Sequence, residues 1–451
     1  MDLLVMLLTR RAPTGVATLP RRSGHRAFAV LLAAGALLRI VVMLGYESAE
    51  LFWYDSFSYL DTALHLKPSG AFHPAGYPAF LAVLSPFGSV RLIAGVQHGL
   101  GLGVAVLTYA LLRRRRLPAW GACLAAVPVL FDPAFLRIEH AILSESLLIV
   151  LLVGAVTVLL WRLSMVNAAL AGVLIACAGL VRSAAVPLLG LFGLYLLVKR
   201  TGWRPLVALL IAGGLPLLGY AAWFQQHHGR FALSGADGVS LWARSMTFAD
   251  CARIRPPADL ARLCPNGTVV DAASEYVWAP GASLNRLGGD RFRHNALARR
   301  FALAAITAQP FDYVADIARD ATLPWSLTPV AHPKRVPSLT DLPVGSWGLP
   351  EQFGLVAKVR AEYDPSIRGV SSVEPWSGLL GAWPWPYVLH GPLFLVMLAA
   401  ALRRPSLPWA VGLFLYLGPI AAMDFDHRYM LPAVPLACLG AALAFAPVRS
   451  K

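Results

Sequence analysis

Long apolar runs separated by short polar turns fill the first half of the chain and return near its end. A helix needs about 17 to 25 mostly apolar residues to cross the hydrocarbon core of a bilayer. Ten runs reach or approach that length, at 27–47, 90–112, 117–132, 141–161, 166–182, 184–198, 205–224, 385–402, 407–422 and 430–447. The third and sixth are short and would need a thinner bilayer or shelter by neighbouring helices. The pattern predicts an all-α polytopic membrane protein with about ten transmembrane helices.

The placement of basic residues predicts how these helices are oriented. Hydrophobic residues make up 57% of the 451 residues and charged residues only 14%, which excludes an ordinary soluble domain. If the N-terminus is inside, nearly all basic clusters beside a span fall on the inner side: Arg10, Arg11, Arg21, Arg22, Arg26, Arg113 to Arg116, Arg162, Lys199, Arg200, Arg204, Arg403, Arg404, Arg449 and Lys451. This placement explains much of the net charge of +15 without a nucleic-acid partner. We expect a multi-pass protein of the plasma (inner) membrane, in contact with lipids and with both termini cytoplasmic.

The predicted topology divides the chain into four parts. They are a basic cytoplasmic tail at 1–26, a membrane module at 27–224 whose first extracytoplasmic loop spans 48–89, an extracytoplasmic insert at 225–384, and C-terminal transmembrane helices at 385–451. The insert is rich in Pro, Gly, Trp and charged residues, and its segment 291–323 predicts one or two amphipathic juxtamembrane helices broken at Pro310. Its size suits a small cap packed on the membrane part.

The five cysteines form no metal-binding pattern. Cys123, Cys177 and Cys438 lie in apolar runs and are expected to be inert thiols. Cys251 and Cys264 lie in the insert, where they would pair if that region faces an oxidising space and stay free if it does not.

Asp55 is the first candidate for chemistry, in the stretch LFWYDSFSYL just after the first span. Aromatic residues there are ordinary interfacial anchors. A carboxylate held among them near low dielectric is expected to gain basicity, which suits a general base. Asp61 is expected to be a cap or surface charge. His73, in HPAGYP, would cap a helix, contact a phosphate or, with Asp55, bind a divalent metal.

The segment FDPAFLRIEHAILSESL supplies Arg137, Glu139, His140 and Glu145 as candidate substrate-binding residues. We expect Arg137 and Glu139 at the outer surface and Glu145 about one turn inside the fourth span. An intramembrane carboxylate suggests function. The alternative is that Glu145 is an ion-pair partner of Arg39 or Arg182.

Three arginines are expected to face one outer cavity. Arg39 lies near the outer end of the first span, Arg182 lies between two short spans, and Arg428 lies in MDFDHRYMLP beside His427 and Tyr429. Guanidinium groups match phosphate geometry, so the three would form a phosphate cradle. The alternative is that they reach toward lipid headgroups. The chain lacks a Gly-rich phosphate loop, a GxSxG elbow and an HExxH motif, so nucleotide hydrolysis is not expected.

The order of these motifs resembles the polyprenyl-phosphate-dependent GT-C glycosyltransferases, in particular the protein O-mannosyltransferases and lipid A aminoarabinose transferases. The resemblance rests on WYDSFSYL, HPAGYPAFLAVL, LSESL, GLVRSAAVPLL, AITAQPFDYVADIARD and DHRYMLPAVPLACLGAA. It covers residues 30–224 and 385–447. Within the insert it covers only the amphipathic segment.

The resemblance implies specific roles. Asp55 matches the catalytic first-loop aspartate, and Arg428 and Tyr429 match a late RY-x-x-P turn that holds the lipid phosphate or braces the fold. The donor would be a polyprenyl-phosphate sugar, and the acceptor a glycan, lipid or protein. The family often has a second acid after the aspartate, but Ser56 stands here, which leaves the use of a divalent metal open.

Two other functions compete with glycosyl transfer from a lipid monophosphate. A lipid or sugar transporter or flippase would also contain many spans and buried charges. Transporters, however, commonly have repeated halves and sites near the midplane. A ligase that uses diphosphate-linked glycans would share the chemistry and differ in the donor.

Overall fold

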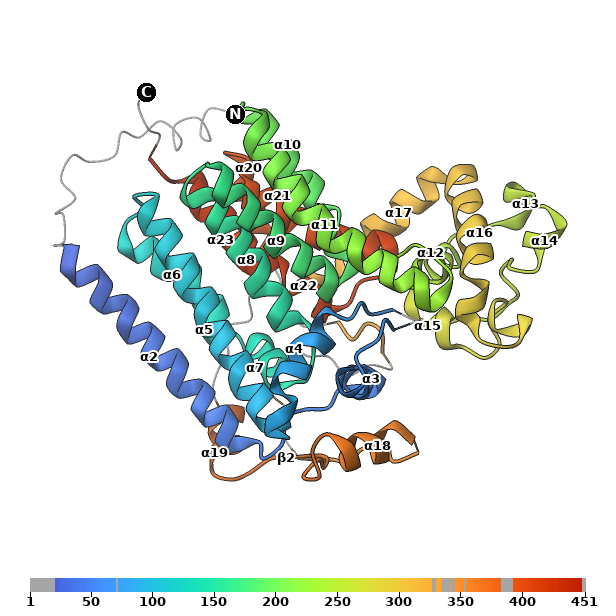
Figure 1. Cartoon of the computed structure of the whole chain (residues 1–451), viewed down its shortest axis with the longest axis horizontal. Coiled ribbons are helices and arrows are strands. Elements are labelled where there is room, and N and C mark those ends of the chain that lie inside the picture. The colour runs from blue at the N-terminus through green and yellow to red at the C-terminus, as the bar shows by residue number, and fades with distance from the viewer. Residues whose placement is uncertain are drawn as a thin grey trace.

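The computed structural model describes residues 21–69, 72–326, 330–334, 342, 345–352, 354–382 and 392–447. Most of the tail predicted at 1–26 and the first seven residues of the run predicted at 385–402 lie outside these ranges. Helices dominate the described residues (Figure 1). Their only paired strands are β1 (Ser346–Trp347) and β2 (Val370–Ser371), which are antiparallel. The protein is an all-α polytopic membrane protein, as the sequence predicts.

The apolar bundle comprises α2 (Arg21–Gly45), α5 (Val90–Arg114), α6 (Ala119–Phe131), α7 (Pro133–His140), α8 (Glu145–Trp161), α9 (Met165–Val181), η2 (Ser183–Ala185), α10 (Leu188–Val198), α11 (Trp203–His228), α20 (Pro392–Leu402), α21 (Leu407–Ala422), α22 (His427–Met430) and α23 (Ala433–Ala444). Near one end of the bundle lie α3 (Trp53–Leu64), α4 (Gly76–Leu84), η1 (Ser85–Phe87), α18 (Gly354–Glu362) and α19 (Trp376–Gly381) (Figure 1). Each of the ten predicted apolar runs overlaps one of these helices.

Length separates these helices into two groups. Within the described residues, three helical stretches are long and apolar enough to cross a membrane: His25–Gly45, Val90–Arg114 and Trp203–His228. The pair α6 and α7 would make a fourth, bent by 51°. The other apolar helices are shorter, so the total of about ten crossings remains a prediction.

The bend between α6 and α7 has a local cause. Pro133 has no backbone N–H to continue the hydrogen-bond ladder of α6, and Asp132 Oδ1 accepts the N–H of Ala134 at 2.9 Å as an N-cap. The chain therefore starts a new helix in a new direction. This turn brings α7 into the protein, where it packs on α5 and α6.

Small residues allow the central helices to approach closely. A Cβ on Gly172 of α9 would collide with the carbonyl oxygen of Leu209 on α11. α8, α9 and α11 accordingly lie side by side (Figure 1). Backbone contact of this kind is a usual way for membrane helices to associate, since lipid offers no hydrophobic drive for it.

The insert has a core of its own beside the bundle (Figure 1). It contains α12 (Asp237–Ser245), α13 (Cys251–Ile254), α14 (Ala258–Ala261), α15 (Ala273–Trp278), η3 (Asn285–Leu287), η4 (Arg291–His294), α16 (Asn295–Ala308), α17 (Pro310–Ala321) and η5 (Leu323–Trp325). Trp242 and Phe301 are fully buried at its centre. The predicted break at Pro310 is confirmed, because α16 ends just before it and α17 begins at it.

Cys251 and Cys264 form a disulfide in the insert, while Cys123, Cys177 and Cys438 are free. We expect a thiol-reactive maleimide to add three times to denatured, unreduced protein and five times after reduction, as measured by intact mass. Replacing both bonded cysteines with serine should destabilise the insert by about 3 kcal/mol, because a short loop in the unfolded chain is no longer closed. Cys177→Ser is the control. Five adducts without reduction would contradict the assignment.

Candidate functional site

Asp55 lies in the first turn of α3, whose start is fixed to the connection between α7 and α8. The backbone N–H of Phe52 donates to Ser56 Oγ at 2.7 Å, and Ser56 Oγ donates to the carbonyl of Ile142 at 2.9 Å. Farther along α3, Asp61 forms an ion pair with Lys358 of α18 at 2.5 Å, consistent with the predicted surface charge. Asp55 is thus held on a helix that is anchored at both ends.

Asp55 has two polar partners from distant parts of the chain. Arg428 Nη1 of α22 donates to Asp55 Oδ2 at 3.0 Å, and His73 Nε2 lies 3.4 Å from Asp55 Oδ1. The side chain of Asp55 is 28% exposed, whereas that of Arg428 is 5% exposed. The N-cap Asp426 accepts the backbone N–H of Arg428 at 2.8 Å and so fixes the start of α22. Asp55, His73 and Arg428 therefore meet in the folded protein, although Arg428 lies far from the other two in the sequence.

Glu145 connects Arg428 to Arg182. Its side chain is fully buried, and its Oε1 forms ion pairs with Arg428 Nε at 3.0 Å and with Arg182 Nη2. Arg182 also donates to Ser144 Oγ at 3.1 Å and lies over the Tyr429 ring at 4.8 Å. Glu145 is the first residue of α8 rather than one turn inside it, because the preceding connection remains non-helical. Of the two partners considered for Glu145, Arg182 is present and Arg39 is not.

The expected gain in basicity of Asp55 is wrong. Burial alone would raise the pKa of Asp55, but the positive charge of Arg428 and the hydrogen bond from His73 hold it below its usual range. Asp55 is therefore ionised at neutral pH. The expectation rested on the low dielectric around this carboxyl group and left out the positive charge of Arg428.

Asp55 lines a cavity of about 380 Å³. Its lining comes from three parts of the chain: Phe52, Asp55, Phe72 and His73 from the first loop, Ser274, Glu275 and Trp278 from the insert, and Asp424, Arg428 and Tyr429 from the late turn. Sequence reasoning missed the insert residues, because no local motif marks them. Asp424 lies in the acidic segment just before Arg428, but it was not among the predicted site residues. We refer to this space as the Asp55 cavity.

Three other predicted site residues lie in a buried cluster away from the Asp55 cavity. Arg39 and Glu139 form a buried pair at 2.8 Å, and Glu139 also lies 2.8 Å from His98 Nδ1. The same cluster extends from His98 Nε2 to His140 Nδ1 at 3.4 Å. Arg39 does not join the other two arginines, because the carbonyl groups at the end of α6 and Glu139 hold its guanidinium inside the bundle.

The expected surface position of Arg137 and Glu139 is also wrong. Both are buried, because α7 turns inward after Asp132. Arg137 forms a bidentate pair with Glu50, from Nε at 2.9 Å and from Nη2 at 2.8 Å. This pair joins α7 to the start of the first loop, so Arg137 braces the scaffold that carries Asp55.

His427 likewise lies outside the lining of the Asp55 cavity. Its ring is buried, with Nε2 at 2.9 Å from the carbonyl oxygen of Val330. It therefore ties α22 to the segment that follows the insert helices.

A metal does not fit the residues around Asp55. Among the described residues, no group of three or more His, Cys, Asp or Glu side chains is arranged to hold a metal ion. His73 and Asp55 offer two ligands, and the guanidinium of Arg428 lies against the carboxylate that a cation would need. We therefore derive no step through a metal.

No family model matches the chain, and no curated protein is significantly similar to it in sequence. It is similar to three kinds of solved structure. The S. cerevisiae protein O-mannosyltransferase Pmt1-Pmt2 complex bound to the sugar donor is 15% identical, with a TM-score of 0.37 and coverage of 51% of this chain and 36% of that chain. The Archaeoglobus fulgidus oligosaccharyltransferase AglB in complex with an inhibitory peptide and a dolichol-phosphate is 14% identical, with a TM-score of 0.41 and coverage of 92% and 50%.

The third is ArnT from Cupriavidus metallidurans bound to undecaprenyl phosphate, which is 14% identical, with a TM-score of 0.36 and coverage of 92% and 77%. The chain thus matches about a third to a half of the length of the first two proteins. The similarity is distant.

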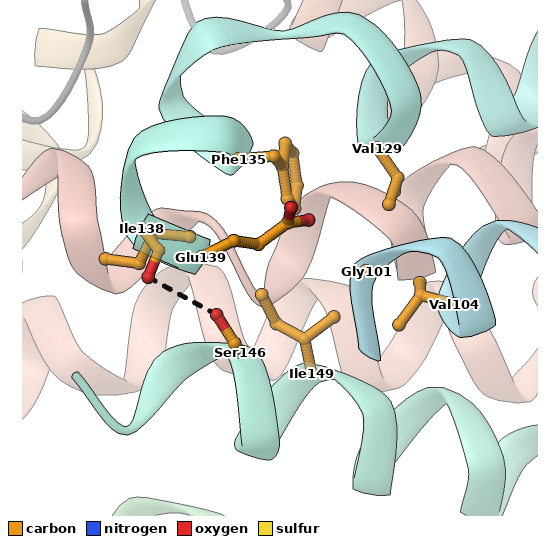
Figure 2. A pocket seen from close by; sticks show the side chains of 8 residues that line it. All are labelled: Gly101, Val104, Val129, Phe135, Ile138, Glu139, Ser146 and Ile149. Carbon is orange, nitrogen blue, oxygen red and sulfur yellow. Dashed lines mark hydrogen bonds between the residues drawn. The ribbon is translucent and has the colours of Figure 1, made fainter. Parts of the chain in front are cut away.

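The buried Glu139 cluster leads to a stability prediction. Figure 2 shows Glu139 projecting toward Gly101 of α5, beside a void of about 10 Å³. A Cβ on Gly101 would collide with the Glu139 carboxylate, whereas a Cβ on Gly103 of the same helix meets no atom within 4 Å. We expect Gly101→Ala to destabilise the protein by about 1–3 kcal/mol through overpacking. Gly103→Ala should be neutral or slightly stabilising. Thermal unfolding in detergent measures both, and equal melting temperatures would contradict the packing described.

Proposed function

We propose that the protein is a membrane glycosyltransferase that moves a sugar from a polyprenyl-phosphate donor to an acceptor hydroxyl on the extracytoplasmic face. The observation that carries this proposal is an ionised carboxylate and a buried arginine, 3.0 Å apart, in one cavity beside the apolar bundle. A lipid-linked donor must bring its phosphate to the edge of the membrane, and we propose that Arg428 meets it there. The Arg428 guanidinium lies beside the aromatic rings of Phe52 and Tyr429.

The arginines provide the charge that a phosphate needs. Arg182 and Arg428 share Glu145, so one carboxylate offsets two guanidinium groups before Asp55 is counted. A bound phosphate would compete with Asp55 for Arg428, since both are oxyanions that suit the guanidinium fork. As the sugar leaves, charge grows on the phosphate oxygen, and a cation already in place stabilises that charge.

Asp55 would serve as the base in the transfer. The acceptor oxygen forms a bond to the anomeric carbon, the bond from that carbon to the phosphate oxygen breaks, and its electron pair stays on the phosphate. The proton of the acceptor hydroxyl passes to Asp55. Donor binding would draw Arg428 toward the phosphate and so release the basicity that this arginine suppresses in the unliganded cavity. His73, 3.4 Å from Asp55, would orient the carboxylate.

This mechanism predicts a large effect of one amide substitution. Asp55→Asn should lower kcat for sugar transfer by roughly 10²–10⁴-fold, because it removes the proton acceptor and leaves the shape of the site. Asp61→Asn is a matched control on the same helix, since Asp61 is also ion-paired and its side chain is 25% exposed. Transfer is measured with purified protein in lipid, using polyprenyl-monophosphate sugars and candidate acceptors.

Three results would contradict the proposal. One is full activity of Asp55→Asn. Another is movement of a labelled lipid-linked sugar across vesicles without any glycoside product, which indicates a transporter or flippase. The last is transfer from diphosphate-linked donors alone, which indicates a glycan ligase.

A further inference from the structure

The Asp55 cavity changes character along its length. From Arg428 the lining passes through Asp55 to His73 and then to Phe72, whose ring centroid lies 6.3 Å from that of His73 and 5.9 Å from that of Trp278. The end near Arg428 is cationic, whereas the end near Trp278 is aromatic and acidic. Asp55 lies between these ends. The aromatic end is not explained by phosphate binding.

One carboxylate oxygen of Asp424 lacks a hydrogen-bond partner among the described residues. The residue is 1% exposed and lines the cavity. Its Oδ2 accepts the backbone N–H of Ser274 at 2.9 Å, while its buried Oδ1 has no hydrogen-bond partner in the described part of the chain. A buried polar atom without a partner is costly. A ligand hydroxyl in the cavity would supply the missing hydrogen bond.

The charge state of Asp424 favours a hydroxyl over a phosphate. Burial raises the pKa of Asp424 to about 7, against the opposing hydrogen bonds from Ser274, and the nearby carboxylate of Asp426 raises it further. Near neutral pH the group exists in both forms, so it can accept or donate a hydrogen bond. Glu275, on the same helix as Trp278, also lines the cavity, and its carboxylate would repel an anion there.

Trp278 presents a fixed aromatic surface to the same space. Its side chain is 44% exposed, and the guanidinium of Arg291 lies 4.9 Å from its ring centroid. Arg291 also donates to the carbonyl of Val277, which holds this arrangement in place. An indole ring joins a large apolar face to a polar edge. That combination suits a sugar, whose ring has C–H faces and hydroxyl edges.

We propose that Asp424 and Trp278 form a sugar-binding subsite, in which Asp424 hydrogen-bonds a ring hydroxyl and Trp278 packs against a hexose or pentose ring. The proposal rests on the proposed function, because it takes the Asp55 cavity as the place of sugar transfer. The sugar belongs either to the donor or to a glycan acceptor, and the experiment distinguishes these sources.

The test compares binding of ligands with and without a sugar. Full-length protein in lipid nanodiscs is titrated with polyprenyl phosphate, with polyprenyl-phosphate mannose and glucose, and with the soluble methyl glycosides of both sugars. Asp424→Asn preserves the size of the residue and an acceptor for the N–H of Ser274, so folding should be kept. We expect this variant to weaken binding of at least one sugar-bearing ligand by about 10- to 100-fold, and to bind bare polyprenyl phosphate as the wild type does.

A second variant tests the subsite without touching Asp424. Trp278→Leu should weaken binding of the same sugar-bearing ligand, and Trp347→Leu serves as the control. Trp347 is 46% exposed, similar to Trp278, but lies on β1 and does not line the cavity. Weaker binding of lipid-linked sugars assigns the subsite to the donor. Weaker binding of methyl glycosides alone assigns it to the acceptor.

Failure of this inference differs from failure of the proposed function. The sugar subsite is overturned if Asp424→Asn and Trp278→Leu change the binding of no sugar-bearing ligand. It is also overturned if they weaken the binding of bare polyprenyl phosphate equally. The variant Arg428→Lys tests the phosphate end separately, because loss of the planar guanidinium fork should weaken the binding of bare polyprenyl phosphate. If this variant binds polyprenyl phosphate as the wild type does, the proposed function itself is contradicted.

Discussion

The site depends on one buried carboxylate, that of Glu145. A charged group in a membrane protein interior is expensive unless an opposite charge accompanies it. Glu145 meets Arg182 and Arg428 at once, and Arg428 then reaches Asp55. Each of these charges is therefore held in place by the next one. The position of the Asp55 carboxylate relative to Arg428 is set by this chain of ion pairs rather than by α3 alone.

The connection between α7 and α8 serves two separate charge clusters. Residues just before it, Glu139 and His140, point into the bundle and join Arg39. Ser144 at its end and Glu145 just after it contact Arg182 and Arg428. Between them the backbone pairs with Glu50, since the amide of residue 142 donates to its carbonyl. A short segment thus fixes the first loop against the bundle and also supplies the counter-charge for the site.

The sequence was sufficient for features set by local chemistry. Apolar runs located the helices and Pro310 located the break in the insert, and Asp55, His73 and Arg428 were among the candidate residues that the fold brings together. Features set by long-range packing were not accessible. The inward turn after Asp132 decides that Glu139 is buried, and only the folded insert brings Trp278 beside the first loop.

Asp55 and Arg428 are 373 residues apart in the chain. During synthesis Asp55 emerges from the ribosome among the first residues, and its arginine follows only after nearly all helices have been made. Until then the aspartate lacks its Arg428 partner, and the nascent chain cannot complete its charge-paired centre. A product that ends before α22 would therefore carry Asp55 without the arginine that offsets most of its charge.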